Sequence, residues 1–155
     1  PTFVNVDQHP SDYKWPDYDH GLFSLKELID TMELTQTDPD GLANSFIDHM
    51  LNESPSDEIR SMLFDEISRV PPSIKSAILF DQTMRDYREI LPKVDVPTLV
   101  CLGEDEKFVT TSGVEYSAEK MPNSEIIRFE NSGHCPFLEE HSKFNQVIKE
   151  FVERI

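Results

Sequence analysis

Glycine is scarce in this sequence. Only five glycines occur among its 155 residues, whereas an average usage of about 7% would give about eleven. No two of them stand four positions apart, so the chain contains no G-x-S-x-G nucleophile elbow, and it also contains no G-x-G-x-x-G fingerprint and no Walker phosphate loop. These residues therefore carry neither the usual nucleotide-binding loops nor the usual turn that presents a nucleophilic serine.

Cysteine and basic residues are also few. The two cysteines, Cys101 and Cys135, form no C-x-x-C pair, which argues against a zinc site and against a disulfide scaffold. Lys and Arg number 14 against 30 Asp and Glu, so the net charge is −16, and such a surface repels nucleic acid and anionic lipid. We therefore expect no metal, no nucleic-acid partner, no membrane partner, and a cytoplasmic location in a reducing compartment.

Long apolar runs are absent as well. The longest stretches, such as residues 99–102 with their flanks, fall far short of the roughly 20 residues that cross a bilayer. The opening residues, Pro1 to Val4, include no Met, no basic segment and no apolar core of a signal peptide. We expect no transmembrane segment, and a start that was cut from a longer chain.

Hydrophobic periodicity divides the first part of the chain. Residues 2–6 alternate like a short strand, and the loop over residues 11–22 is rich in Asp, Tyr, Trp and Pro. Between residues 24 and 91, apolar side chains recur at helical spacing and predict three amphipathic helices. The runs that carry this pattern are Leu42–Leu51, Ile59–Ile67 and Ile74–Leu91.

The pattern changes after Pro97. A continuous apolar run over residues 98–102 is typical of a strand that is buried on both faces. It is followed by a capping box that opens a helix over residues 112–121, by a second strand over residues 125–129, and by a helix from about Ser142. This β-α-β-α order predicts a parallel strand pair with a right-handed connection, as in doubly wound sheets.

Two loops follow the carboxyl ends of these strands, where open α/β sheets bind their ligands. The loop over residues 103–109 contains three carboxylates in a row, and the loop over residues 131–137 contains His134. Because both loops lie at the same edge of a parallel sheet, a carboxylate of the first can accept a hydrogen bond from the imidazole of the second. Such a pair is the base half of a nucleophilic relay.

These residues resemble the C-terminal part of an α/β-hydrolase, the superfamily of esterases, lactonases and non-haem haloperoxidase-like enzymes. The segment Pro97–Gly103 resembles the strand before the acid, and Asn131–His141 resembles the catalytic-histidine loop. The resemblance implies a core strand and its loop over residues 1–10, a helical cap with its entry loop over 11–93, and the C-terminal β-α-β-α part of the core over 94–155.

In this family the chain order is nucleophile, acid, histidine. The resemblance therefore implies that the nucleophile and the oxyanion loop lie upstream of residue 1, and that the N-terminal half of the hydrolase is absent from this chain. That half is then an expected partner, either on the same chain or on a separate one. No cofactor is implied.

The resemblance also assigns site residues. His134 is the expected base, and Glu106, three residues after Gly103, occupies the position of the acid, although Glu stands where Asp is usual; Asp105 and Asp7 remain alternatives. A metal site formed by His134, Glu139, Glu140 and His141 is disfavoured, because glutamates in a first helical turn are explained by the helix dipole. Three aromatic residues, Trp15, Tyr18 and Phe23, are expected to line the substrate pocket.

The function implied by this resemblance is a serine hydrolase with a catalytic triad that acts on a carboxylic ester or lactone through an acyl-enzyme. One alternative keeps the fold but changes the chemistry, to haloperoxidase-like perhydrolysis or to dehalogenation with an upstream Asp nucleophile. Another alternative is a noncatalytic binding module. The small-molecule substrate itself is not specified by these residues.

Overall fold

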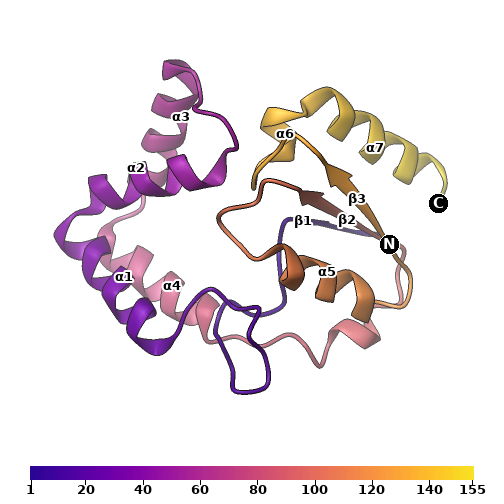
Figure 1. Cartoon of the computed structure of the whole chain (residues 1–155), viewed down its shortest axis with the longest axis horizontal. Helices are drawn as coiled ribbons and strands as arrows, with labels where there is room; N and C mark the ends of the chain where they lie inside the picture. Colours follow the sequence, from indigo (N-terminus) through magenta and orange to yellow (C-terminus); the bar gives the residue numbers. More distant parts are fainter.

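The computed structural model describes residues 1–155 and contains a parallel sheet of three strands, which lies in the right-hand half of the view in Figure 1. The strands are β1 (Phe3–Val6), β2 (Thr98–Gly103) and β3 (Ser124–Phe129), in the order β1-β2-β3. Both pairings are parallel, with Val4 opposite Leu99 and Val100 opposite Ile126. The expected parallel pair is therefore present, and β1 joins its other side from a position more than 90 residues earlier in the chain.

The alternation of side chains along β2 creates two hydrophobic layers. Val100 and Leu102 pack with Val114 of α5 (Thr111–Lys120), whereas Leu99 and Cys101 face the opposite way and pack with residues of α7 (His141–Glu153). The two helices consequently cover opposite faces of the sheet (Figure 1). This arrangement explains why every residue of β2 is buried and why its sequence is a continuous apolar run.

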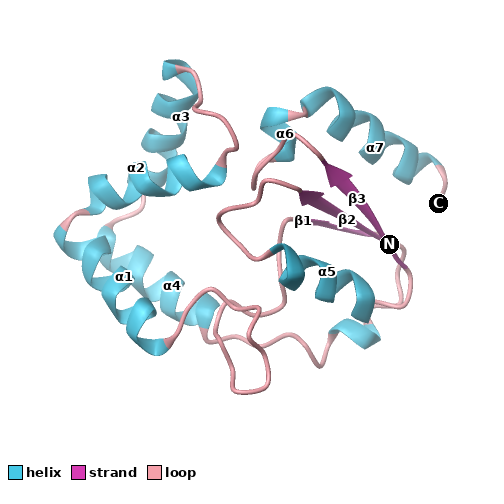
Figure 2. Cartoon of the chain, viewed as in Figure 1, coloured by secondary structure: helices cyan, strands magenta, loops and turns pink.

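The region between β1 and β2 folds into a separate group of helices, which we call the helical lobe (Figure 2). Its members are α1 (Leu25–Thr37), α2 (Pro39–Met50), α3 (Asp57–Ser68) and α4 (Pro72–Thr83). α1 packs against α4, and α2 packs against α3. None of the helices of the structure combines the length and the apolarity that a bilayer crossing requires.

The prediction of three helices was wrong in this lobe, because there are four. α1 was missed because several of its apolar residues, such as Leu25 and Ile29, are exposed and do not form a clear buried stripe. A capping box of Ser24 and Glu27 starts α1, and Asp38 and Pro39 separate it from α2, since the Asp38 side chain accepts from the Gly41 N–H.

The third predicted helix also ends earlier than expected. α4 stops at Thr83, and the next helical turn is the short 3₁₀ helix η1 (Leu91–Lys93). In between, the backbone turns toward the N-terminal loop, where the Tyr87 N–H donates to the Pro10 carbonyl at 2.9 Å. This pairing with residues distant in sequence overrides the local helical periodicity.

The carboxyl end of β2 lies very close to the loop after β3. A Cβ atom on Gly103 would overlap the carbonyl oxygen of Gly133 and would lie 2.6 Å from that of Ser132. Both obstacles are backbone atoms of the loop after β3, so neither can rotate aside as the end of a side chain could. Only glycine fits at the point where the two loops meet.

We predict that Gly103→Ala lowers the free energy of unfolding by about 3 kcal/mol, at the upper end of the range for overpacked positions. Gly41→Ala is the matched control. There, a Cβ would meet only the side chain of Asp38, so the cost of the lost cap is offset by the higher helix propensity of Ala, each about 1 kcal/mol. Urea unfolding of the full-length protein measures both, and equal losses would contradict the prediction.

Candidate active site

The loops after β2 and β3 bring an acid and a histidine into contact. His134 Nδ1 lies 2.7 Å from Glu106 Oε2. The Glu106 side chain is fully buried and that of His134 is 13% exposed, so the pair is shielded while the imidazole retains access to its surroundings. The sheet topology explains the meeting, because both residues follow the carboxyl ends of adjacent parallel strands.

Backbone groups hold the Glu106 carboxylate in place. Its Oε1 accepts from the N–H of Phe108 at 2.5 Å and from that of Val109 at 3.1 Å, which leaves Oε2 for the imidazole. A carboxylate only accepts hydrogen bonds, so Nδ1 of His134 must be the protonated nitrogen. The other nitrogen, Nε2, is then free to accept a proton.

A glutamine that the sequence did not single out lies next to this nitrogen. Gln8 Nε2 is 3.4 Å from His134 Nε2. Gln8 comes from the loop after β1, which ends at the same sheet edge as the loops of Glu106 and His134. The sequence assigned this residue no role, and the pairing of β1 with β2 brings it to the imidazole.

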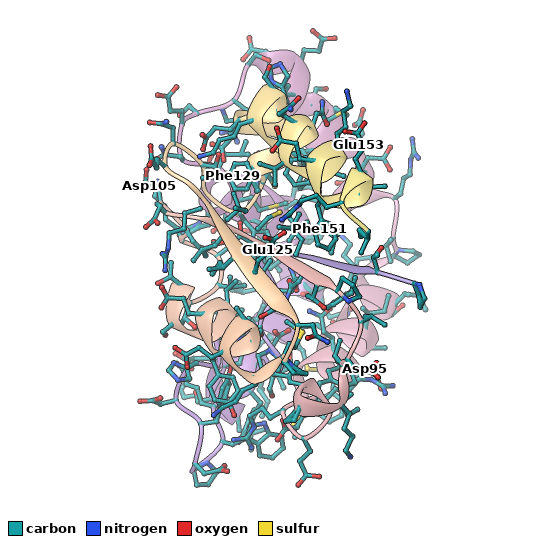
Figure 3. All side chains as sticks on the ribbon, turned by 90° about the vertical axis from the view of Figure 1, so that its right-hand side faces the viewer. Asp95, Asp105, Glu125, Phe129, Phe151 and Glu153 are labelled. Atoms are coloured by element: carbon teal, nitrogen blue, oxygen red, sulfur yellow. The ribbon has the colours of Figure 1, made fainter.

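The two alternative acids occupy different positions. Asp105 is exposed and lies at the periphery of the molecule (Figure 3). Asp7 is fully buried, has a positive φ of 47° and accepts from the Gly103 N–H with both oxygens, at 3.0 and 3.1 Å. Of the three carboxylates, Glu106 is the one that contacts the imidazole. Asp7 instead binds the backbone N–H at the end of β2.

Asp7 is nevertheless close to the pair. Single ligand atoms of Asp7, Glu106 and His134 lie within 4.8 Å of one another, a spacing that a metal ion could bridge. Burial and, next, the charge of Glu106 raise the pKa of Asp7 from 3.8 to about 7, because two neighbouring buried carboxyls cannot both ionise at low cost. Two of the other suggested metal ligands, Glu139 and Glu140, accept from backbone N–H groups.

A groove leads away from the imidazole. It has a volume of about 430 Å³ and runs between the loop after β1, the loop over residues 103–109 that contains Glu106 (the acid loop), α2 and α4. Phe108 connects it to the site, because its ring lies 5.0 Å from the His134 ring and 5.3 Å from that of Phe46. A more apolar cavity of about 310 Å³ within the helical lobe adjoins the groove and shares Phe46, Leu79 and Gln82 with it.

The three aromatic residues expected at the pocket differ in position. Phe23 lines the groove. Tyr18 is only 3% exposed and lies beneath Arg88, whose guanidinium is 4.9 Å from the ring centre, and Trp15 donates to Ser11 Oγ at 2.8 Å. Trp15 and Tyr18 pair with each other across a tight turn, so this loop folds on itself and neither residue lines the groove.

No family model matches the chain. The AB hydrolase superfamily protein YisY of Bacillus subtilis is 26% identical over 145 residues, which are 92% of this chain and 53% of that protein. A proline iminopeptidase of Saccharolobus solfataricus is 36% identical over 70 residues, 45% of this chain and 22% of that protein.

Among solved structures, an esterase from Exiguobacterium antarcticum superposes with a TM-score of 0.91 at 20% identity, over 98% of this chain and 57% of the esterase. The chain thus spans little more than half of the length of this esterase and of YisY, and less of the peptidase. The fold class expected from the sequence is confirmed.

The raised pKa of the buried Asp7 carboxyl predicts that the stability of the folded protein depends on pH. Its pKa is about 7 in the folded protein against 3.8 when unperturbed, so between about pH 4 and pH 7 the folded state keeps a proton that the unfolded state has lost, and stability falls as the pH rises. Asp7→Asn removes this titration, keeps an oxygen for the Gly103 N–H and tolerates the positive φ. We expect its melting temperature, relative to the parent protein, to be higher at about pH 8 than at about pH 4.5.

Asp105→Asn is the control for this measurement, because it removes a carboxyl from an exposed position of the neighbouring loop. Melting curves of both variants and the parent across this pH range provide the comparison. If the difference between Asp7→Asn and the parent were constant with pH, Asp7 would not be the titrating group.

Proposed function

Because this chain belongs to the α/β-hydrolase superfamily, we propose that it supplies the base and the acid of a serine hydrolase that acts on a carboxylic ester or lactone. The observation that carries the proposal is the 2.7 Å contact between His134 Nδ1 and Glu106 Oε2. It leaves His134 Nε2 as the acceptor for a proton. A buried carboxylate behind an imidazole is the arrangement that nucleophilic acyl transfer requires.

In the proposed reaction, His134 Nε2 removes the proton of a serine hydroxyl as its oxygen attacks the carbonyl carbon of the substrate. The imidazolium then donates this proton to the leaving alcohol, and the acyl-enzyme forms. In the second half, Nε2 takes a proton from water as the water oxygen attacks the acyl carbon. The bond from the acyl carbon to the serine oxygen then breaks, the imidazolium returns its proton to that oxygen, and the acid is released. Throughout, the charge of Glu106 stabilises the imidazolium and keeps the ring in its orientation.

The serine and the oxyanion hole are proposed to lie upstream of residue 1, in the part of the hydrolase that precedes this chain. β1 supports this assignment because it pairs only with β2 and its other edge is open. Backbone groups along such an edge accept a further strand. The preceding half is therefore the proposed partner of this sheet, and the helical lobe is proposed to be the cap over the completed site.

The lining of the groove favours a small, uncharged substrate with an apolar part. Its lining contains the aromatic rings of Phe23, Phe46 and Phe108, of which Phe108 lies beside the His134 ring, and the adjoining cavity in the helical lobe is more apolar. Binding pockets of this size range bury much of a small ligand. The net charge of −16 opposes the approach of anionic substrates.

We predict that His134→Ala and Glu106→Gln each abolish most of the turnover of p-nitrophenyl acetate by the full-length protein. Replacement of the acid by its amide removes the charge that supports the imidazolium. We expect kcat to fall by about 10²–10⁴, because the same exchange costs a serine protease about 10⁴, while KM changes little. His141→Ala and Asp105→Asn, both at exposed positions, are the matched controls and should stay within about threefold.

A fluorophosphonate probe tests the position of the nucleophile in the same protein. It should label a serine upstream of residue 1 and should block turnover. A label within residues 1–155 would contradict the proposal, as would unchanged turnover in His134→Ala. Turnover that resists the probe would favour an Asp nucleophile, and the absence of any hydrolysis would favour a binding module.

A further inference from the structure

The backbone of the helical lobe contacts the backbone of the loop over residues 131–137, which contains His134 and is called the histidine loop below. The connection between α2 and α3 passes directly beside Gly133 and His134, and the His134 N–H donates to the Met50 carbonyl at 2.8 Å. A Cβ on Gly133 would lie only 3.1 Å from both the Met50 carbonyl oxygen and the Asn52 nitrogen. The turn over residues 50–53 and the histidine loop therefore form a direct backbone contact, with no side chain between them.

One carboxylate joins the two segments. Glu139 Oε2 accepts from the Gly133 N–H at 2.8 Å, and Oε1 accepts from the Asn52 N–H at 2.6 Å and more weakly from the Glu53 N–H at 3.4 Å. Each oxygen thus binds one side of the contact. Residue 139 ends the short helix α6 (Pro136–Glu139), which follows the histidine loop directly and holds the carboxylate at this position.

The neighbouring Glu140 has a different set of partners. Its Oε2 accepts from the Asn131 N–H at 3.0 Å and from the Ser132 hydroxyl at 2.7 Å. Both donors belong to the histidine loop, and neither belongs to the helical lobe. The two adjacent glutamates therefore separate two effects, since only Glu139 connects the loop to the lobe.

The acid loop contacts the same turn. Lys107, the residue after Glu106, donates from Nζ to the Asn52 carbonyl at 3.2 Å. The loop of Glu106, through Lys107, and the loop of His134, through its backbone N–H, are therefore both attached to residues 50–53. A shift of this turn would be transmitted to His134 through Gly133.

We propose that Glu139 is a positioning residue whose two carboxylate oxygens fasten the 50–53 turn of the helical lobe to Gly133, so that the position of the lobe sets the position of the His134 imidazole. The kinetic consequence rests on the function proposed above. The mechanical linkage does not, because it follows from the hydrogen bonds alone.

Glu139→Gln tests the linkage with little change of shape. An amide presents one acceptor oxygen and one NH₂ group, and the NH₂ cannot accept from a backbone N–H. The variant can therefore satisfy Gly133 or Asn52 but not both. Glu140→Gln is the matched control, because it makes the same chemical change one residue away. The partners of Glu140 lie in the histidine loop and, at 3.8 Å, at Lys143 of α7, and none of them lies in the helical lobe.

The first measurement is hydrogen exchange of the full-length protein, followed by mass spectrometry over peptides that cover residues 50–53 and 131–134. With Glu139→Gln, exchange should accelerate in both segments: about tenfold where the N–H loses its acceptor, and less in the other, whose charge-assisted hydrogen bond becomes a neutral one. With Glu140→Gln, it should accelerate only in the second segment. Acceleration in a single segment for Glu139→Gln would overturn the proposal, whether or not the protein is an esterase.

The second measurement is ester hydrolysis at a temperature well below the melting points of both variants. Glu139→Gln should lower kcat by between about tenfold and 10²-fold, because a small displacement of a reacting group is costly. Glu140→Gln should lower kcat less, even where its melting temperature falls as far. Equal effects on kcat would mean that Glu139 only stabilises the loop, and the positioning role would be rejected.

Discussion

The close contact at Gly103 is the constraint on which the site depends. At this residue β2 ends, its N–H is held by the Asp7 carboxyl from the loop after β1, and its Cα faces the carbonyls of Ser132 and Gly133 from the loop after β3. Three segments that are far apart in sequence meet at one backbone position. The acid loop leaves the sheet from this point, so the place of Glu106 relative to His134 follows from how tightly the strands close here.

The two buried carboxyl groups of the site, those of Glu106 and Asp7, accept hydrogen bonds from different numbers of donors. Glu106 accepts from two backbone N–H groups and from the imidazole, whereas Asp7 accepts from one N–H in a fully buried position. Charge is best placed where most donors compensate it. Burial and, next, the charge of Glu106 raise the pKa of Asp7 to about 7, and the hydrogen bond from the Gly103 N–H offsets only part of this rise.

The helical lobe contributes to the site in two ways. Phe46 of α2 and Leu79 of α4 line the groove and the adjoining cavity, so the lobe shapes both spaces. The turn between α2 and α3 also contacts the histidine loop through Met50 and Asn52. The groove and the histidine loop are therefore connected through the same group of helices, and Glu139, Lys107 and the His134 N–H all contact the turn that joins them.

The sequence by itself determined the elements whose signals are local. The apolar run of β2, the helical spacing of α7 and the order of strand, helix and strand predict the parallel pair, and this topology brings the loops of Glu106 and His134 to one edge. Only the family resemblance favoured Glu106 over Asp105 and Asp7. The residue pattern alone left all three open, because all three follow the ends of strands and differ in the donors that surround them.

The tertiary structure alone decided the features that depend on contacts between distant residues. The end of α4 at Thr83 reflects the bond from Tyr87 to Pro10, and the burial of Tyr18 reflects its packing beneath Arg88. Gln8 and Glu139 reach the site only because β1 pairs with β2 and the turn over residues 50–53 lies against Gly133. Such contacts leave no periodic trace in the sequence, since each depends on backbone atoms that residues of almost any type provide.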